Sequence, residues 1–255
     1  MKKIFLLLFV LFLLLPQLIA AEGLYVVPIE GDIEPSKVVF IRRGIQEAKS
    51  AGAETIVFRI NTFGGRVDSA LQIASLIGAE RELETVAFIP AAAESLGVSW
   101  SAGALISFAC SSIYMSPGTS IGAAAPVYQT SEGMEMAPEK SVSAVRTQLA
   151  ALAEKNGYPV SVALAMVDDD VVLREVEVDG ELRLLTDDEY QALKRRAEND
   201  GLSIEEGRVL SDKDKLLTLT AGQMESYGIS SGSVATIEEL AVLLGFEATE
   251  ILEQE

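Results

Sequence analysis

The sequence predicts an α/β protein with a parallel sheet and crossover helices. Short β-branched apolar runs alternate with longer segments whose apolar residues recur at the helical spacing. The run Thr55–Ile60 is apolar almost throughout, as is typical of a parallel strand buried on both faces. Of the 255 residues, 49% are hydrophobic, so the chain has enough apolar side chains for a sizeable core.

The first half of the chain supplies this alternation in order. The expected strands are residues 24–29, 55–60, 85–89 and 112–115, and the expected helices are residues 35–50, 67–76 and 101–108. The first helix is supported by apolar residues near the helical period, including Val38, Ile41 and Ile45. Because a helix stands between most successive strands, the strands are expected to run parallel.

The pattern changes after Asp168. Asp179-Gly180 separates the runs 171–178 and 181–185, which is a strong signal for a two-residue hairpin. Thr186 and Glu189 form a capping-box pattern at the start of a helix. Residues 199–215 are polar and are expected to be rich in loops. A small β-hairpin–helix insertion is therefore expected at about residues 169–215.

The last elements are short. Residues 216–220 are expected to form the last strand, and Thr236 is expected to cap a final helix over 237–244. Residues 22–255 are thus interpreted as one domain that contains the insertion.

The N-terminus has the features of a targeting segment. Lys2 and Lys3 precede the unbroken apolar run Ile4–Leu15, and the small residues Ala20 and Ala21 follow. The run is shorter than the roughly 20 residues that span a bilayer, so residues 1–21 are interpreted as a cleaved signal peptide, with an uncleaved N-terminal anchor as the alternative. Either one places the body outside the cytoplasm, free or tethered to the membrane.

Composition excludes several kinds of chemistry. The chain has 20 Lys+Arg and 38 Asp+Glu, a net charge of −18, which argues against a surface for nucleic-acid phosphates. It has no histidine, so a Ser-His-Asp triad and a His-ligated zinc site are impossible. Cys110 is the single cysteine, which excludes an intrachain disulfide and a thiolate cluster. No metal or cofactor is expected.

The glycine pair Gly64-Gly65 follows directly on a predicted strand. Two glycines at a strand-to-helix turn let a backbone approach a ligand closely, and their N–H groups can form an oxyanion hole. A tight turn without a ligand is the simpler alternative for this pair taken alone.

Ser101 opens the small-residue helix that is predicted to follow. The positive end of a helix dipole favours a negatively charged oxygen there, which would make Ser101 a nucleophile, although a plain N-cap serine is more common. Without histidine, a serine needs another base. Lys140 is expected in the first turn of a helix that begins near Pro138 and runs to Lys155, where the dipole disfavours a positive charge and so favours the neutral amine. A lysine that only faces solvent is the alternative for this residue taken alone.

These residues together resemble the NfeD family, also called stomatin operon partner proteases, which are ClpP-class membrane-associated serine proteases. The likeness runs from about residue 24 to 246. It rests on the motifs Asn61-Thr62-Phe63-Gly64-Gly65, Ser101-Ala102-Gly103-Ala104, Met115 to Val127, and Lys140.

The resemblance implies a ClpP/crotonase-like fold and a Ser-Lys dyad. It makes Ser101 the nucleophile and Lys140 the general base, and it makes the N–H groups of Gly65 and Ala102 the oxyanion hole. The implied substrates are hydrophobic segments of membrane-associated proteins, such as a stomatin-like partner, and the implied assembly is a homodimer or a higher oligomer. Phe63, Gly64, Met134 and Met136 are expected to contact the substrate.

The sequence also departs from the family pattern. Phe63 stands where proline is common, Ala125 replaces a frequent histidine, and the usual Asn-Asp pair after the lysine is absent. The missing pair keeps open a second interpretation, a catalytically inactive scaffold that binds a stomatin-like membrane protein. An acyl-CoA enzyme of the crotonase type and a non-peptide esterase are further alternatives, since both stabilise an oxyanion with backbone N–H groups.

Overall fold

The computed structural model describes residues 23–91, 97–129, 131, 133–247 and 251–254. The expected signal peptide, residues 1–21, lies outside the described residues. Within the described ranges, no helix has both the length and the apolar character needed to cross a bilayer.

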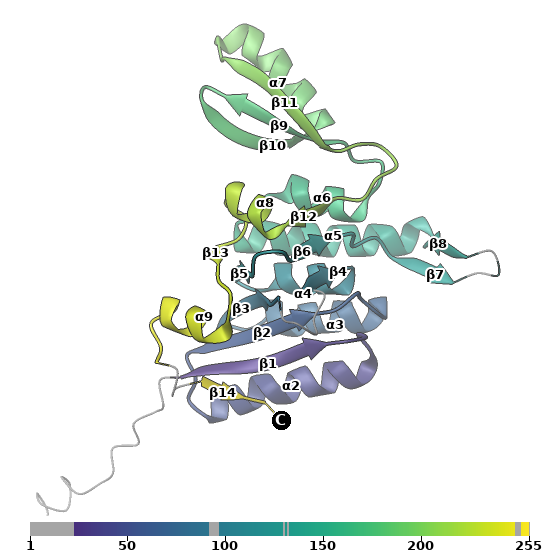
Figure 1. Cartoon of the computed structure of the whole chain (residues 1–255). Coiled ribbons are helices and arrows are strands. Elements are labelled where there is room, and N and C mark those ends of the chain that lie inside the picture. The colour runs from purple at the N-terminus through teal and green to yellow at the C-terminus, as the bar shows by residue number, and fades with distance from the viewer. Residues whose placement is uncertain (1–22, 92–96, 130, 132, 248–250, 255) are drawn as a thin grey trace, which may run out of the picture.

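A parallel sheet forms the centre of the protein (Figure 1). In the described part of the chain it has six strands, in the order β13 (Gly232–Ser233), β5 (Ser112–Met115), β3 (Glu84–Ile89), β2 (Thr55–Asn61), β1 (Leu24–Glu30) and β14 (Ile251–Glu253). Every neighbouring pair is parallel. The predicted α/β class with parallel strands is therefore confirmed.

Helices cover both faces of the sheet, as buried parallel strands require. The face with the larger core carries α2 (Pro35–Ser50), α3 (Val67–Gly78), α4 (Ala102–Ala109), α5 (Glu139–Asn156) and α6 (Val160–Val167). The other face is covered by α9 (Ile237–Leu243), whose Leu240 and Ala241 pack on strand residues such as Val57 and Phe88. The side chains of each strand alternate between these two cores.

The crossover helices begin and end close to the predicted positions. Pro35 occupies the first turn of α2, where its missing N–H costs nothing, and Ile41 and Ile45 face the core. Helix α5 follows Pro138 and ends at Gly157, which adopts the left-handed conformation with φ 78°. Local signals therefore place both ends of these helices.

A smaller sheet adjoins the central one. Its strands are β12 (Thr218–Thr220), β6 (Ser120–Gly122) and β4 (Val98–Trp100), and β4 leads directly into α4. The strands β7 (Val127–Gln129) and β8 (Met134–Met136) form an antiparallel pair that extends away from the body (Figure 1).

The region after α6 forms a separate small unit that projects from the body (Figure 1). Strands β9 (Leu173–Val178) and β10 (Glu181–Thr186) pair with Val178 opposite Glu181, so Asp179 and Gly180 form the two-residue turn that the sequence predicts. Both turn residues have positive φ, 51° and 84°, as a type I′ turn requires.

Helix α7 (Asp187–Asp200) follows this hairpin directly. The predicted capping box is present, since Thr186 accepts the N–H of Glu189 and the Glu189 carboxylate accepts the N–H of Thr186. The predicted hairpin and helix start are therefore confirmed.

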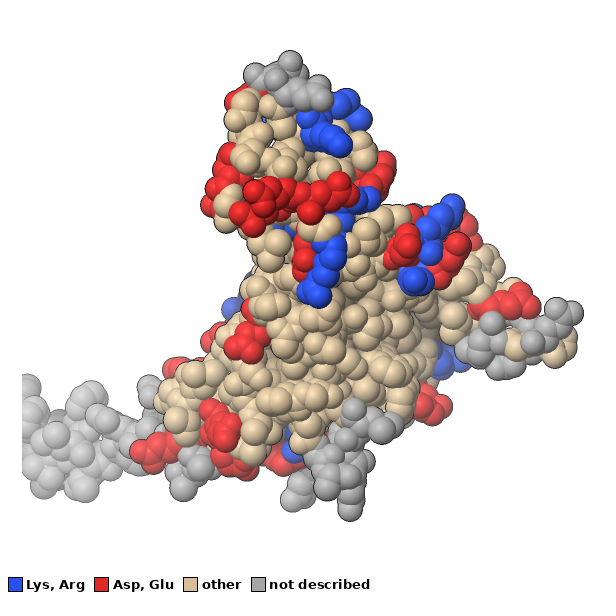
Figure 2. Space-filling model, turned by 45° about the horizontal axis from the view of Figure 1, so that its top comes forward, with Lys and Arg blue, Asp and Glu red and all other residues tan. Residues whose placement is uncertain are grey.

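The prediction that residues 199–215 are rich in loops is wrong. Residues Ile204–Ser211 form β11, which pairs antiparallel with β9. The strand is mostly exposed and charged, so it lacks the apolar alternation that marks a strand in a sequence. It is held by pairing and by ion pairs, Arg174 with Glu206 and Arg208 with Glu175. Figure 2 shows acidic and basic side chains crowded over this unit, while much of the body visible in that view is uncharged.

The prediction that 216–220 is the last strand is also wrong, because β13 and β14 come later in the chain. Both are very short, and each forms only by adding to an existing edge of the central sheet, β13 to β5 and β14 to β1. A segment of two or three residues carries no periodicity, so tertiary pairing alone defines these strands.

Candidate functional site

Ser101 stands at a sharp turn between a strand and a helix. Strand β4 ends at Trp100 and α4 begins at Ala102, and Ser101 between them has φ 52° and ψ −113°. A residue with a side chain rarely adopts such angles, and holding them costs about 1–3 kcal/mol. The N–H of Ser101 donates to the carbonyl of Gly122 at 3.0 Å, which fixes the turn. This strained geometry resembles that of nucleophiles that are presented on strand-to-helix turns.

The glycine turn lies against Ser101 on one side and against Ile33 on the other. The N–H of Ile33 donates to the carbonyl of Gly64 at 2.9 Å, and the N–H of Arg66 donates to the carbonyl of Ile33 at 2.8 Å. In this parallel bridge Ile33 bonds the residues on either side of Gly65, so the N–H of Gly65 itself points away from Ile33.

Two backbone N–H groups are left free beside Ser101. Within the described ranges, the amides of Gly65 and Ala102 have no hydrogen-bond partner. Ala102 is the first residue of α4, where the first four N–H groups have no partner inside the helix. A side chain on Gly64 would come 3.5 Å from the Ala102 nitrogen, so the glycine turn approaches this amide closely. Backbone N–H groups without a partner are the kind of donor that can bind a negatively charged oxygen.

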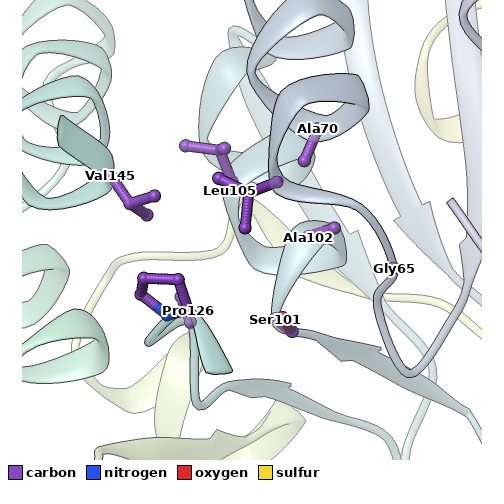
Figure 3. Close-up of a pocket in the computed structure, with 9 residues that line it drawn as sticks. Gly65, Ala70, Ser101, Ala102, Leu105, Pro126 and Val145 are labelled. Atoms are coloured by element: carbon purple, nitrogen blue, oxygen red, sulfur yellow. The ribbon is translucent and has the colours of Figure 1, made fainter. Parts of the chain in front are cut away.

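An apolar pocket opens beside Ser101 (Figure 3). The residues that line it are Gly65, Val67, Ala70, Ser101, Ala102, Leu105, Ala124, Pro126 and Val145. They come from the glycine turn, α3, the turn at Ser101, α4, the loop after β6 and α5. The pocket therefore exists only in the folded chain. In Figure 3, the side chains of Leu105, Pro126 and Val145 converge on one space above Ser101.

Phe63 lies near Ser101 but does not line this pocket. Its side chain is 57% exposed and packs edge-on against Trp100, with ring centroids 5.5 Å apart. Trp100 is the residue before Ser101, so the two aromatic rings stand next to the serine on the solvent side.

The structure shows no hydrogen bond between Lys140 and Ser101. It lies in the first turn of α5 with an exposed side chain, and in the part of the chain that the structure describes it makes no hydrogen bond or ion pair. Val145 on the same helix lines the pocket, but five residues correspond to about 140° of rotation around a helix, so the two side chains leave α5 on different sides.

The two methionines expected to contact substrate, Met134 and Met136, belong to β8, on the hairpin that extends from the body (Figure 1). Met136 does not line the pocket. The Met136 side chain is 37% exposed. The structure thus brings together Ser101, Gly64, Gly65 and Ala102.

The sequence patterns indicate no role for Thr62 or for most of the residues that line the pocket. Thr62 lies inside the recognised motif before the two glycines. Its hydroxyl donates to the carbonyl of Gly31 and accepts the N–H of Gly64 in the turn. The pocket residues Ala70, Pro126 and Val145 carry no chemical signal of their own. They belong to segments far apart in the chain, which only the fold brings together.

The fold and the site define an α/β protein with a parallel sheet and crossover helices, in which a serine stands on a strand-to-helix turn beside backbone amides that have no partner in the described ranges. Residues 23–202 match the NfeD1b N-terminal domain family. The chain belongs to this family, which confirms the resemblance drawn from the motifs.

Two curated proteins are similar to the chain. Membrane protein NfeD1b of Bacillus subtilis (strain 168) is 32% identical over 230 residues, which cover 90% of this chain and 43% of that protein. Membrane-bound protease PH1510 of Pyrococcus horikoshii is 29% identical over 179 residues, which cover 69% of this chain and 40% of that protein. The chain spans less than half the length of either relative.

Two solved structures of the 1510-N membrane-bound stomatin-specific protease have a similar fold. One is a serine-to-alanine mutant, with a TM-score of 0.66 at 20% identity over 92% of this chain and 98% of that one. The other is a lysine-to-alanine mutant in complex with a substrate peptide, with a TM-score of 0.63 at 21% identity over 91% of each chain.

Proposed function

We propose that this chain is a serine endopeptidase that uses Ser101 as nucleophile and Lys140 as general base. The observation that carries the proposal is the placement of Ser101 on a strained turn, between the free amides of Gly65 and Ala102 and at the mouth of an apolar pocket. A nucleophile, an oxyanion site and a pocket for an apolar side chain are the parts that acyl transfer from a hydrophobic peptide needs.

The proposed reaction proceeds through an acyl-enzyme. Neutral Lys140 takes the proton of the Ser101 hydroxyl as its oxygen bonds to the peptide carbonyl carbon, and the Gly65 and Ala102 amides hold the resulting oxyanion. The C–N bond then breaks as the Lys140 ammonium returns the proton to the leaving amine. Water, deprotonated by Lys140, attacks the ester, and the proton goes back to the Ser101 oxygen.

For this role, the Lys140 amine would have to move to Ser101, to which it makes no hydrogen bond in the structure. It lies on α5, the helix that also contributes Val145 to the pocket wall. Catalytic hydrogen bonds are often longer before substrate binds. We propose that a bound peptide or a neighbouring subunit brings the amine to Ser101.

The relatives support a membrane-associated peptide substrate. The proteins named above include a membrane-bound protease and a stomatin-specific protease with a substrate peptide, and the two solved mutants replace a serine and a lysine. We propose that this chain cleaves hydrophobic segments of a stomatin-like partner, with Phe63, Gly64, Met134 and Met136 contacting the peptide. We further propose an extracytoplasmic location and a homodimer or higher oligomer.

One observation favours a second function. Lys140 is exposed and lacks a partner among the described residues. A chain whose base never reaches the serine would act as an inactive scaffold that binds a stomatin-like membrane protein.

Cleavage of hydrophobic peptides distinguishes the two functions. Wild type, Ser101→Ala and Lys140→Ala are incubated with a panel of such peptides, and the products are read by mass spectrometry. Cleavage by wild type alone supports the protease. Binding of the peptides by all three folded proteins, without cleavage, supports the scaffold. Equal cleavage by all three would exclude Ser101 and Lys140 from the reaction.

A further inference from the structure

Thr62 lies between the glycine turn and the strand that leads to Ser101. It is 1% exposed and follows directly on β2. We infer that Thr62 is a positioning residue, which holds the Gly65 amide and the Ser101–Ala102 turn at a fixed separation. The inference rests on the proposed function, because the groups it aligns are the nucleophile and the oxyanion donors of that reaction.

The hydroxyl of Thr62 fixes the glycine turn. It lies 2.6 Å from the carbonyl oxygen of Gly31, to which it donates, and it accepts the N–H of Gly64 at 3.0 Å. The N–H of Gly64 is buried, and losing a buried partner costs far more than a surface hydrogen bond. The Thr62 hydroxyl also lies 3.2 Å from the carbonyl oxygen of Gly64, which shares a peptide plane with the Gly65 N–H. Together with the bond from the Ile33 N–H to the same carbonyl, the Thr62 contacts therefore hold the direction of the free Gly65 amide.

The backbone of Thr62 fixes the strand that carries the serine. Its N–H donates to the carbonyl of Val98 at 2.9 Å, and its carbonyl accepts the N–H of Trp100 at 3.0 Å. Trp100 is the last residue of β4 before Ser101. Thr62 therefore bonds to the glycine turn through its side chain and to the serine's strand through its main chain.

The methyl group of Thr62 contacts the helix that carries the second donor. A Cβ atom placed on Gly103 would lie 2.8 Å from the Thr62 Cγ2 atom, so Gly103 and this methyl already pack closely. Gly103 follows Ala102 in the first turn of α4. The hydroxyl and the methyl of one side chain thus face the two halves of the oxyanion site.

Two substitutions in the full chain test the hydroxyl and the methyl of Thr62 one at a time. Thr62→Val keeps the shape and the methyl but removes the hydroxyl, and Thr62→Ser does the reverse. We expect Thr62→Val to lower kcat by about 10–100-fold with KM within about threefold of wild type, because a misplaced donor affects the transition state more than binding. We expect Thr62→Ser to retain kcat within about threefold.

Thr85→Val is the matched control. Thr85 is also buried and also accepts a backbone N–H, that of Ser111 at 3.0 Å, but it lies at the opposite end of the parallel strands. We expect Thr85→Val to lower the melting temperature without lowering kcat. If Thr62→Val behaves like Thr85→Val, the side chain is only structural and the inference is overturned.

A second measurement does not depend on activity. Amide hydrogen exchange is followed in peptides that cover residues 61–66 and 98–103, in wild type and in both Thr62 variants. Faster exchange in both peptides for Thr62→Val, with near-normal rates for Thr62→Ser, supports the inference. Unchanged exchange in Thr62→Val overturns it. If wild type cleaves no peptide, the proposed function fails, and the exchange result still decides the role of Thr62.

Discussion

Gly64 and Ser101 are so close that position 64 has no room for a side chain. A Cβ atom on Gly64 would lie 2.7 Å from the Cβ and 2.9 Å from the Oγ of Ser101. A Cβ atom on Gly65 would lie 2.4 Å from the carbonyl oxygen of Ile33. The two glycines are therefore needed for different reasons, one to admit the serine and the other to admit the Ile33 backbone.

Gly64→Ala should remove activity by displacing Ser101. The control is Gly118→Ala, because Gly118 also has a positive φ, 88°, but nothing lies within 4 Å of the added methyl. The backbone strain alone should cost each variant about 1–2 kcal/mol of stability. Peptide cleavage and labelling of the serine by a fluorophosphonate should fail in Gly64→Ala only. Normal labelling of Gly64→Ala would show that a methyl group at position 64 does not displace Ser101.

Lys140→Arg should be inactive although the positive charge is kept. A guanidinium does not lose its proton in proteins and cannot serve as a base, and removing a general base costs about 10²–10⁴-fold in rate. The melting temperature should not change, since Lys140 is exposed and makes no hydrogen bond or ion pair in the part of the chain described. Lys155→Arg on the same helix is the control, since its Nζ donates to the carbonyl of Gly78 at 2.9 Å, away from Ser101. An active Lys140→Arg would exclude the proposed base.

Ala70→Leu should narrow the range of peptides that are cleaved. Ala70 is 2% exposed and lines the pocket, so a larger side chain fills the space meant for an apolar residue of the substrate. We expect kcat/KM to fall for peptides with a large apolar residue beside the cleaved bond and to change little for those with alanine there. Ala144→Leu, at an exposed position on α5, should leave kcat/KM unchanged for both groups of peptides. An equal fall for all peptides would indicate general damage to the fold.

Glu80→Gln should destabilise the protein more than Glu82→Gln. Both carboxylates pair with Lys49, at 3.0 Å and 2.8 Å, but the Glu80 side chain is 6% exposed and the Glu82 side chain 75% exposed. Glu80 also accepts two backbone N–H groups. We expect losses of about 1–3 kcal/mol for Glu80→Gln and under about 0.5 kcal/mol for Glu82→Gln, measured by urea unfolding.

The difference in unfolding free energy between wild type and Glu80→Gln should depend on pH. Burial raises the pKa of Glu80, but the backbone N–H groups and Lys49 outweigh it and hold the pKa below its usual range. A lowered pKa gives stability that is present above the unfolded-state pKa and is lost as the pH falls through the folded-state value. The advantage of wild type over Glu80→Gln should therefore shrink in acid. An advantage that stays constant would contradict this account.

Cys110 should resist thiol reagents until the protein unfolds. It is fully buried at the end of α4, and burial raises the pKa of its thiol, so little thiolate forms. Iodoacetamide at mildly alkaline pH should label it fully in urea and hardly at all in the native state. Since a raised pKa gives stability that is lost as the pH rises, labelling should increase in strong alkali. Rapid native labelling would show that α4 opens readily.

The predictions from sequence were most accurate where the signal is local. The turn at Asp179-Gly180 and the capping box at Thr186 depend on neighbouring residues, so both were found at the correct positions. Strand β11 was missed because its pattern is charged, and β13 and β14 were missed because they are too short to have a pattern. The motif residues Gly65, Ser101 and Ala102 were named in advance, and the structure places them together.

From the amino acids alone one can infer the alternation of strands and helices, the exclusion of histidine chemistry, and the family to which the chain belongs. These follow from composition, periodicity and short motifs, which are properties of adjacent residues. The folded structure is needed to see that Ser101 is strained, that the Gly65 amide turns away from Ile33, and that Thr62 contacts both Gly64 and Gly103. These relations join β2, β4 and α4, and the packing of the core brings those elements together in a way that leaves no signal in the local sequence.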